Sequence, residues 1–319
     1  MSNYTHNSEI DLVYLWVDGN DIDWLNKKNA FLNKEKGLNI DAVSKARTAD
    51  NHELLHSLRS AETCAPWIRN IIIVTDEQKP HWLNTDNPKV KIIDIRDILP
   101  PQAIPCYNSV VIEYFLYRIP GLSERFLYAN DDMFFHKPIT PDFFFDEKSG
   151  FPIVRLQRSL FGKLINNFKA RFNIHRNLYR ITIDNAAKLI DRDYGKYYSG
   201  TPHHNIDAYL KSDLRNITEV AFKEEISQIV TNHFRHESDI QRILMLYYAL
   251  ATKRGVLKYM NRYESCRIRV YKPDFMWFIK KYNPALFCLN DTPRATDEDR
   301  ARIKPFLETL FPNKSSFEK

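Results

Sequence analysis

The sequence predicts an α/β fold with a mixed, mainly parallel sheet in its first half and a mainly helical region in its second half. Up to residue 130, four short apolar runs rich in β-forming residues alternate with helical patterns. Such alternation is typical of parallel strands that are covered by helices on both faces. From residue 151 onward, helical periodicity predominates. We therefore expect an α/β core over residues 1–150 and a mainly helical region over residues 151–319, packed together as one domain.

The individual elements follow from the same patterns. The apolar runs predict strands at residues 10–17, 70–76, 90–94 and 125–130. Helical patterns lie at residues 53–63, 110–118, 239–251 and 274–281. Acidic residues stand at the ends of these strands, among them Asp18, Asp76 and the pair Asp131-Asp132. Ligands of open α/β sheets bind beyond the carboxyl ends of the strands, so we expect the functional site at this edge.

Glycine is scarce, with 8 residues among 319, and no two of them are closer than Gly195 and Gly200. A dinucleotide-binding GxGxxG motif and a protein-kinase glycine loop are therefore excluded. Gly195 and Gly200 have the spacing of a P-loop, but Thr201 and Pro202 follow them in place of Lys and Ser/Thr. If the protein binds phosphate, we expect side chains or a metal ion to hold it.

The charge balance is mildly basic, with 46 Lys and Arg against 40 Asp and Glu and a net charge of +6. This excess suits an anionic substrate or a membrane surface, and no recognised nucleic-acid module is present, so we expect no nucleic-acid partner. The 4 cysteines form no CxxC pair, which favours free thiols in a reducing compartment. The first residues are polar, and no apolar run reaches the ~20 residues that span a bilayer. We expect a cytoplasmic protein, at most peripheral on the inner face of the plasma membrane.

Acidic residues at the ends of the predicted strands are candidate metal ligands. In Asn130-Asp131-Asp132, two adjacent carboxylates leave an apolar strand. A divalent cation such as Mg²⁺ or Mn²⁺ would satisfy both carboxylates while it contacts a phosphate. A solvated turn or a helix N-cap explains the motif equally well. For the second pair, Asp18 and Asp21, an Asx-turn is the simpler explanation.

Two motifs in the second half contain candidate catalytic residues. His203-His204 precede Asp207, and a His beside a carboxylate can act as a general base near neutral pH. Neighbouring side chains point apart, so at most one of the two is expected to be catalytic; the alternative is the start of a helix through residues 208–210. Arg235 precedes an apolar helical pattern and could clamp a phosphate. The alternative for Arg235 is a surface ion pair with a nearby acid.

Residues 155–180 predict a basic amphipathic helix, because they include seven Lys or Arg, no acid, and apolar residues at i, i+4 spacing. The apolar positions are Leu160, Leu164, Phe168 and Phe172. Such a helix could contact an anionic membrane, an anionic polymer or a lipid-linked acceptor. The alternative is a core helix with a solvated basic face.

Together and in this order, the motifs resemble the Stealth family of sugar-1-phosphate transferases, which includes bacterial capsule and exopolysaccharide phosphotransferases. The family also includes the catalytic subunit of the lysosomal N-acetylglucosamine-1-phosphotransferase. The resemblance covers most of the chain, in four blocks. The blocks are residues 10–19, residues 47–133 with Arg47 and Asn108, residues 202–207, and a last block made of Arg235, His236 and Asp239 with Cys288-Leu289-Asn290-Asp291.

The resemblance implies a core like that of nucleotide-sugar glycosyltransferases of the GT-A type, with residues 1–150 binding the donor and residues 151–319 binding the acceptor. An acceptor hydroxyl of a glycan or lipid-linked oligosaccharide would attack the β-phosphorus of a UDP-sugar, releasing UMP and leaving a phosphodiester. The site residues that the resemblance implies are Asp131, Asp132 and Asp291 for a divalent cation (Mg²⁺ or Mn²⁺), Arg235 for phosphoryl charge with Arg47 as a second candidate, His203 or His204 as the base, and Asp18, Arg47, Asn108 and Asn130 around the donor.

Two other functions are consistent with the same residues. A metal-dependent glycosyltransferase would move the sugar alone and release UDP in place of UMP. A non-catalytic protein that binds polysaccharide or membrane would show no turnover and no response to metal chelation. The acidic residues at the strand ends argue against the second alternative, since a binder of anionic polymers would not place carboxylates there.

Overall fold

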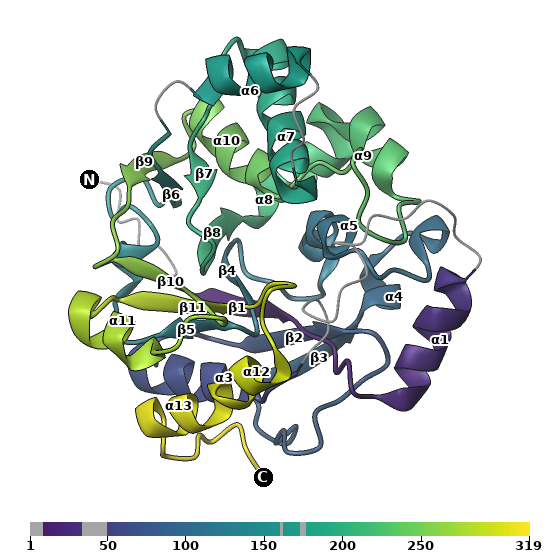
Figure 1. Cartoon of the computed structure of the whole chain (residues 1–319). Coiled ribbons are helices and arrows are strands. Elements are labelled where there is room, and N and C mark those ends of the chain that lie inside the picture. The colour runs from purple at the N-terminus through teal and green to yellow at the C-terminus, as the bar shows by residue number, and fades with distance from the viewer. Residues whose placement is uncertain (1–8, 34–49, 160–161, 173–176) are drawn as a thin grey trace, which may run out of the picture.

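The computed structural model describes residues 9–33, 50–159, 162–172 and 177–319, and a five-stranded sheet lies at its centre (Figure 1). The strand order is β3-β2-β1-β4-β8. Its strands are β1 (Ile10–Leu15), β2 (Ile71–Thr75), β3 (Val90–Asp94), β4 (Arg125–Asn130) and β8 (Asp207–Leu210). β1 to β4 are parallel, and β8 pairs antiparallel with β4. The predicted α/β class with a mixed, mainly parallel sheet is confirmed, as are the four predicted strands.

Helices cover the main sheet on both sides, which explains why its strands are apolar throughout. Along β1, Leu12 and Tyr14 pack in the same cluster as residues of α3 (Glu53–Cys64). Val13 points to the other face and packs with residues of α5 (Ser109–Tyr114), α7 (Leu178–Tyr194) and α10 (Ile243–Ala251). Figure 1 shows α3 on one side of the sheet and α5, α7 and α10 on the other. The site at the strand ends is thus built on a rigid three-layer core.

The remaining helices connect or flank this core. They are α1 (Ile22–Leu32), α4 (Ile95–Ile98), α6 (Gly162–Arg171), α8 (Lys211–Asn216), α9 (Lys223–Ile229), α11 (Phe275–Tyr282), α12 (Asp297–Ala301) and α13 (Ile303–Leu310), with short 3-10 turns at Pro101–Ala103, Leu116–Arg118 and Pro141–Phe143 and a π-helical turn at Ile217–Ala221. Several of them begin with a capping side chain. Asp21 accepts backbone hydrogen bonds at the start of α1, and Thr296 with Asp299 forms a capping box at the start of α12. None of the helices in the described ranges is long and apolar enough to cross a membrane.

Two small sheets extend the second half of the chain. One has the order β10-β11-β5, with β5 (Met133–Phe135), β10 (Ser265–Arg269) and β11 (Leu286–Asn290). The other has the order β7-β6-β9, with β6 (Ile153–Gln157), β7 (Thr201–Pro202) and β9 (Val256–Tyr259). Because β8 completes the main sheet and β11 pairs with β5, each half of the chain supplies strands to sheets that both halves share. The boundary at residue 150 stays a prediction.

Two local predictions are wrong. Residues 208–210 belong to strand β8 and not to a helix, because Ala208 and Tyr209 pair with β4 and pack in its core. Residues 155–180 do not form one helix: they contain the end of β6, then α6, then the first residues of α7. Arg155 lies in β6, is buried, and stacks over the ring of Phe143 at 3.7 Å. The predicted apolar position Leu160 lies outside the described residues.

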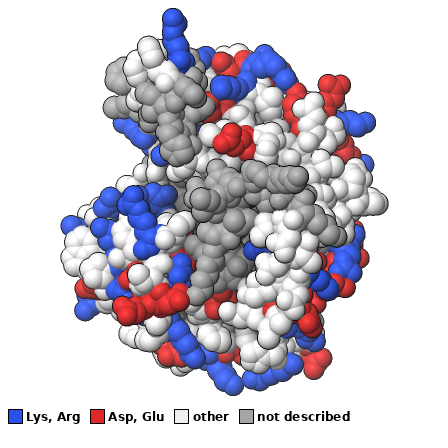
Figure 2. Space-filling view, turned by 45° about the vertical axis from the view of Figure 1, so that its right-hand side comes forward, with Lys and Arg blue, Asp and Glu red and all other residues white. Residues whose placement is uncertain are grey.

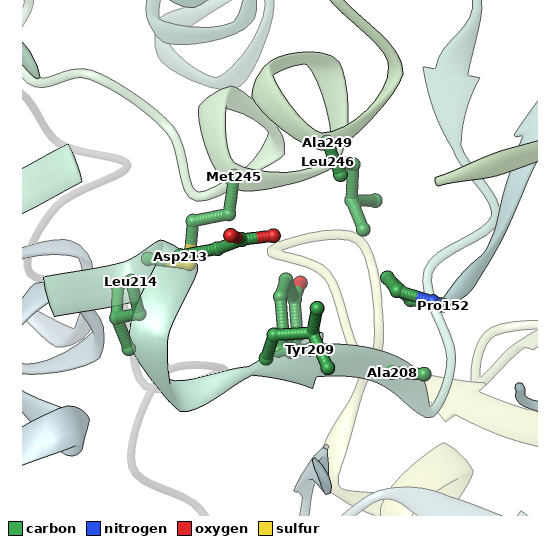
Figure 3. Close-up of a pocket in the computed structure, with 9 residues that line it drawn as sticks. Pro152, Ala208, Tyr209, Asp213, Leu214, Met245, Leu246 and Ala249 are labelled. Carbon is green, nitrogen blue, oxygen red and sulfur yellow. The ribbon is translucent and has the colours of Figure 1, made fainter. Parts of the chain in front are cut away.

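The surface and the interior each have one notable property away from the site. On the face drawn in Figure 2, Lys and Arg lie among Asp and Glu rather than in one continuous basic patch. Between β8, α8 and α10, a cavity of about 10 Å³ is lined by Tyr209, Asp213 and Met245 among others (Figure 3). A space of this size holds about one water molecule and no substrate. The cavity is a packing gap between strand β8 and helices α8 and α10.

Candidate active site

A cleft of about 240 Å³ lies at the carboxyl ends of β1 and β4. Part of its wall is formed by Leu15-Trp16-Val17 at the end of β1 and by Asn130-Asp131-Asp132 at the end of β4. The two strands are parallel neighbours, and Leu15 is paired with Asn130 in their register. The titratable side chains that line the cleft include Lys28, Glu53, Glu113, Asp131, Asp132, His204, Arg235, Arg242 and Asp291. The cleft therefore lies at the edge of the sheet where ligands of α/β proteins bind.

Three of the carboxylates that line this cleft, those of Glu53, Asp131 and Asp132, lie close enough to influence one another. Burial, together with the charges of Glu53 and Asp132, raises the pKa of Asp131 well above its usual value. Burial also raises the pKa of Glu53 to about 8 and that of Asp132 to about 6. Two buried carboxylates that face one another cannot both be ionised cheaply. A cation placed among them would lower all three pKa values.

Asp132 has the geometry of a metal ligand. Its Oδ1 atom is buried and has no hydrogen-bond partner among the described residues. Its Oδ2 atom accepts a hydrogen bond from the Cys288 thiol at 3.3 Å. Ligand atoms of Asp132, His204 and Cys288 all lie within 4.8 Å of one another. An oxygen, a nitrogen and a sulfur at this spacing form a group that could hold a metal ion, and the unpartnered oxygen supports that fit.

Asp291 lies in the same cleft, but its carboxylate already has a partner. The Arg300 guanidinium donates to both carboxylate oxygens, from Nε at 2.7 Å and from Nη2 at 3.2 Å. A bidentate pair of this kind is among the stronger hydrogen-bonded ion pairs. Asp291 therefore reaches a metal ion only by sharing an oxygen with Arg300, and its predicted role as a ligand stays a prediction.

The two histidines have different surroundings. His203 is 2 % exposed and is held between Asp207 Oδ1, at 2.9 Å from Nε2, and Ser265 Oγ, at 3.1 Å from Nδ1. His204 lines the cleft, with its Nε2 at 3.0 Å from Asn290 Nδ2. The backbone of His204 is left-handed (φ +59°), a strained conformation that turns consecutive side chains to different sides. Of the two candidates for the base, His204 is therefore the one in the cleft.

Arg235 enters the cleft from the loop before α10. Its Nη2 atom donates to Ser109 Oγ at 2.5 Å. Asn108, which the sequence suggested near the donor, is fully buried and holds this loop: its Nδ2 atom donates to Asn232 O at 3.0 Å and to Asp239 Oδ2 at 3.0 Å. Asn108 thus stands behind the wall of the cleft and positions the segment that carries Arg235.

The other residues predicted to bind the donor differ in where they lie relative to the cleft. Asn130 lines the cleft, and its Oδ1 atom lies 2.9 Å from the Tyr128 hydroxyl. Asp18 lies next to the cleft, where its carboxylate accepts from the Asn20 backbone N–H at 2.8 Å, as an Asx-turn does. Its charge helps to raise the pKa of Asp50, after burial. Arg47 lies outside the described residues.

Sequence reasoning missed several side chains of this cleft, among them Glu53, Arg242 and Lys28. Glu53 is the first residue of α3, where an acid is commonplace because of the helix dipole, so nothing marked it. Arg242 is buried, and its guanidinium lies 3.3 Å from Asp207 and 3.5 Å from Glu113. Its position directly before the apolar run of α10 was the sequence signal that could have identified it. Lys28 belongs to α1, a helix that the sequence patterns did not predict, and burial lowers its pKa.

Comparison with known proteins agrees with the resemblance seen in the sequence. Models of three conserved regions of Stealth proteins match this chain: region 1 over residues 8–36, region 2 over residues 47–152 and region 4 over residues 279–319. These ranges include the strand-end acids and Asp291, whereas residues 202–207 and Arg235 lie outside them. Among solved structures, the galactosyltransferase LgtC has a TM-score of 0.47 at 12 % identity, covering 96 % of this chain and 97 % of that one. A TM-score below 0.5 leaves that likeness at the level of the α/β class, which the strand order already establishes.

Relatives match the chain over nearly its whole length. It is 31 % identical to a capsular polysaccharide phosphotransferase of Neisseria meningitidis serogroup B, over 97 % of this chain and 84 % of that protein. It is 32 % identical to the capsular polysaccharide phosphotransferase fcs1 of Haemophilus influenzae, over 89 % and 78 %. An exopolysaccharide phosphotransferase of Streptomyces coelicolor is 32 % identical over 97 % of this chain and 52 % of its own length. The chain therefore belongs to the Stealth family of phosphotransferases.

Proposed function

We propose that this chain transfers a sugar-1-phosphate from a UDP-sugar to a hydroxyl group of a glycan or lipid-linked oligosaccharide, in the synthesis of a capsular polysaccharide or exopolysaccharide. The observation that carries the proposal is the composition of the cleft, which is lined by several carboxylates and several cationic side chains. Asp131, Asp132 and Glu53 suit a divalent cation, and Arg235 and Lys28 suit phosphate oxygens. The names of the relatives, capsular and exopolysaccharide phosphotransferases, support the same reaction class.

Phosphoryl transfer asks a protein mainly for positioning and for neutralisation of charge. The acceptor oxygen forms a bond to the β-phosphorus while the bond from that phosphorus to the bridging oxygen breaks, and UMP leaves. Arg235, anchored on Ser109, would hold the oxygens of the transferred phosphoryl group. The anchor restricts the guanidinium before the substrate arrives, so less conformational entropy is lost on binding.

Asp132, with Asp131 beside it and Cys288 within reach as a further ligand, would hold the divalent cation, which leaves the ring nitrogen of His204 free to accept a proton. When bound, the cation would neutralise the diphosphate and make UMP a better leaving group. Carboxylate ligands favour Mg²⁺ or Mn²⁺. The carboxylates would position the cation at the edge of the sheet, where Asn130 and Trp16 also line the cleft.

His204 is the proposed acceptor of the hydroxyl proton. Burial, with the charge of Arg242, lowers the pKa of His204 to about 3, so its imidazole is neutral at physiological pH. A bound diphosphate would bring negative charge beside the ring and raise this pKa toward the range of a general base. A matched pair of variants separates the histidines: His204→Gln should reduce turnover about 100-fold or more, whereas His203→Gln should mainly lower the melting temperature. The opposite pattern would contradict this assignment.

One assay tests the reaction itself. The purified chain is incubated with a panel of UDP-sugars, a glycan acceptor and Mg²⁺ or Mn²⁺, and the released nucleotide is identified by chromatography. Release of UMP with formation of a phosphodiester is the expected result, and EDTA should stop it. Release of UDP would mean that the chain is a glycosyltransferase that moves the sugar alone. No nucleotide release with any donor, by folded protein, would contradict both enzymatic functions.

A further inference from the structure

Helix α6 is packed on the protein in an unusual orientation. Its apolar side chains Leu164, Ile165, Phe168 and Phe172 are 67 %, 46 %, 56 % and 59 % exposed. At about 100° per residue these four positions fall within an arc of roughly 100° on one side of the helix. The rings of Phe168 and Phe172 lie 4.6 Å apart, so the exposed side chains form one continuous surface, which we name the α6 apolar face.

Among the described side chains of α6, a lysine and a glycine contact the body of the protein. Lys163 lies on the opposite side of the helix, with its Nζ atom 2.6 Å from Asp191 of α7 and 5.1 Å from the centre of the Tyr197 ring. Gly162 is buried against Ser199, where an added Cβ would approach the Ser199 Cβ to 2.4 Å. A helix of a globular protein normally turns its apolar stripe to the core. In α6 the apolar stripe instead faces away from the core. Its binding partner would therefore lie outside the described part of the chain.

The charge around this face is positive. Residues 155–180 contain no Asp or Glu, and among the described ones Arg158, Arg171 and Arg180 are exposed. Figure 1 shows α6 at the rim of the molecule, beyond α7 and away from the main sheet. An apolar face flanked by Arg and Lys is the pattern of helices that lie in the interface of an anionic membrane.

We propose that the α6 apolar face binds the surface of a membrane that contains anionic lipid. Leu164, Ile165, Phe168 and Phe172 enter the boundary between headgroups and acyl chains, and Arg158 and Arg171 contact the lipid phosphates. α7, which follows α6, contributes Tyr179 to the wall of the cleft. Membrane binding would thus keep the cleft near a lipid-linked acceptor. That last consequence rests on the proposed function, whereas the binding itself does not.

Vesicle sedimentation of the full chain tests the proposal. The chain should sediment with vesicles that contain about one third phosphatidylglycerol, and less with pure phosphatidylcholine or at high salt. Phe168→Ser/Phe172→Ser should weaken the binding by about tenfold or more, and Arg171→Glu should weaken it and reduce its salt dependence. The matched control is Val220→Ser, since Val220 is 70 % exposed but lies far along the chain, in the π-helical turn. Melting temperatures of all variants should equal that of the parent.

The outcomes separate the alternatives. Equal binding of the Phe168→Ser/Phe172→Ser variant and the parent chain would overturn the proposal, as would absence of binding to anionic vesicles at low salt. If the parent instead forms a dimer in light scattering that the double variant loses, without vesicle binding, the face contacts a second copy and the proposal is wrong. UMP release with a water-soluble acceptor should be the same in the parent and the double variant, so failure of the proposed function would be seen separately.

Discussion

The two ends of strand β1 each have a buried acidic neighbourhood, and the two differ in their partners. At the amino end, Asp11 is fully buried and paired: Arg69 donates to both of its oxygens, at 2.8 and 2.6 Å, and Asn70 and the Ser123 backbone N–H donate as well. Despite burial, these partners hold the pKa of Asp11 below its usual value. At the carboxyl end, Asp131 and Glu53 face other acids, and their pKa values are raised.

Of Asp11, Asp131 and Glu53, only Asp11 forms an ion pair with a described residue, so the pKa shifts of these acids have opposite signs. A buried, hydrogen-bonded acid with an Arg partner maintains the fold. Buried acids without a cation weaken the fold and are typical of functional sites, where the missing charge arrives with a ligand. We therefore expect the amino end of β1 to contribute to stability and its carboxyl end to contribute to binding. Separate variants test each expectation.

The largest effect is expected on turnover. Asp132→Asn and Arg235→Ala should each lower the rate of sugar-1-phosphate transfer by about 10³-fold or more, because each removes a charge that acts on the transferred group. Initial rates per folded molecule measure this effect. Asp11→Asn is the matched control and should retain the parent rate. Retained activity in Asp132→Asn or Arg235→Ala would contradict the placement of the site.

The second effect is on stability. Asp11→Ala should lower the free energy of unfolding by about 3 kcal/mol, because it leaves the Arg69 guanidinium and Asn70 without their buried acceptor. Urea unfolding followed by circular dichroism gives the value. A loss below about 1 kcal/mol, the size of a surface ion pair, would show that the amino end is not the stabilising one.

The third effect has the opposite sign. Without a divalent cation, Asp131→Asn should raise the free energy of unfolding by about 1 kcal/mol, since it removes one of the crowded carboxylates and leaves the backbone unchanged. The same variant should be inactive. A decrease in stability similar to that of Asp11→Ala would mean that Asp131 has a structural partner, and the contrast between the two ends would be lost.

The last effect is a pH dependence. Glu53 has a raised pKa, so the folded state binds more protons than the unfolded state between about pH 4.5 and the folded value of about 8. Its contribution to stability therefore decreases as pH rises through this window. For Asp11 the sign is reversed: its stabilisation is present above its unfolded pKa and is lost as pH falls through the lower, folded value. Thermal unfolding from pH 5 to 8 without divalent cations should show a negative slope that Glu53→Gln reduces; an unchanged slope would contradict the role of Glu53.

The sequence predicted the main sheet and the place of the site because both depend on local patterns. Buried parallel strands are apolar runs, and Asp131-Asp132 directly follow one of them. It did not predict strands β6 and β8, which are short and acquire their identity only from pairing with β9 and β4. Nor did it show that His204 rather than His203 lies in the cleft, because that depends on a left-handed backbone at residue 204. Glu53 and Arg242 were missed because both are ordinary in their local sequence and unusual only in what surrounds them in space.

The central claim is that the carboxylates at the carboxyl end of β1 and β4 hold a divalent cation. Equilibrium binding of Mn²⁺, followed by the paramagnetic resonance of the free ion in the presence of UDP, tests it most directly and without turnover. We predict saturable binding of one ion per chain that Asp132→Asn abolishes and Asp11→Asn leaves unchanged. Absence of saturable binding, or equal binding by Asp132→Asn and the parent chain, would contradict the claim.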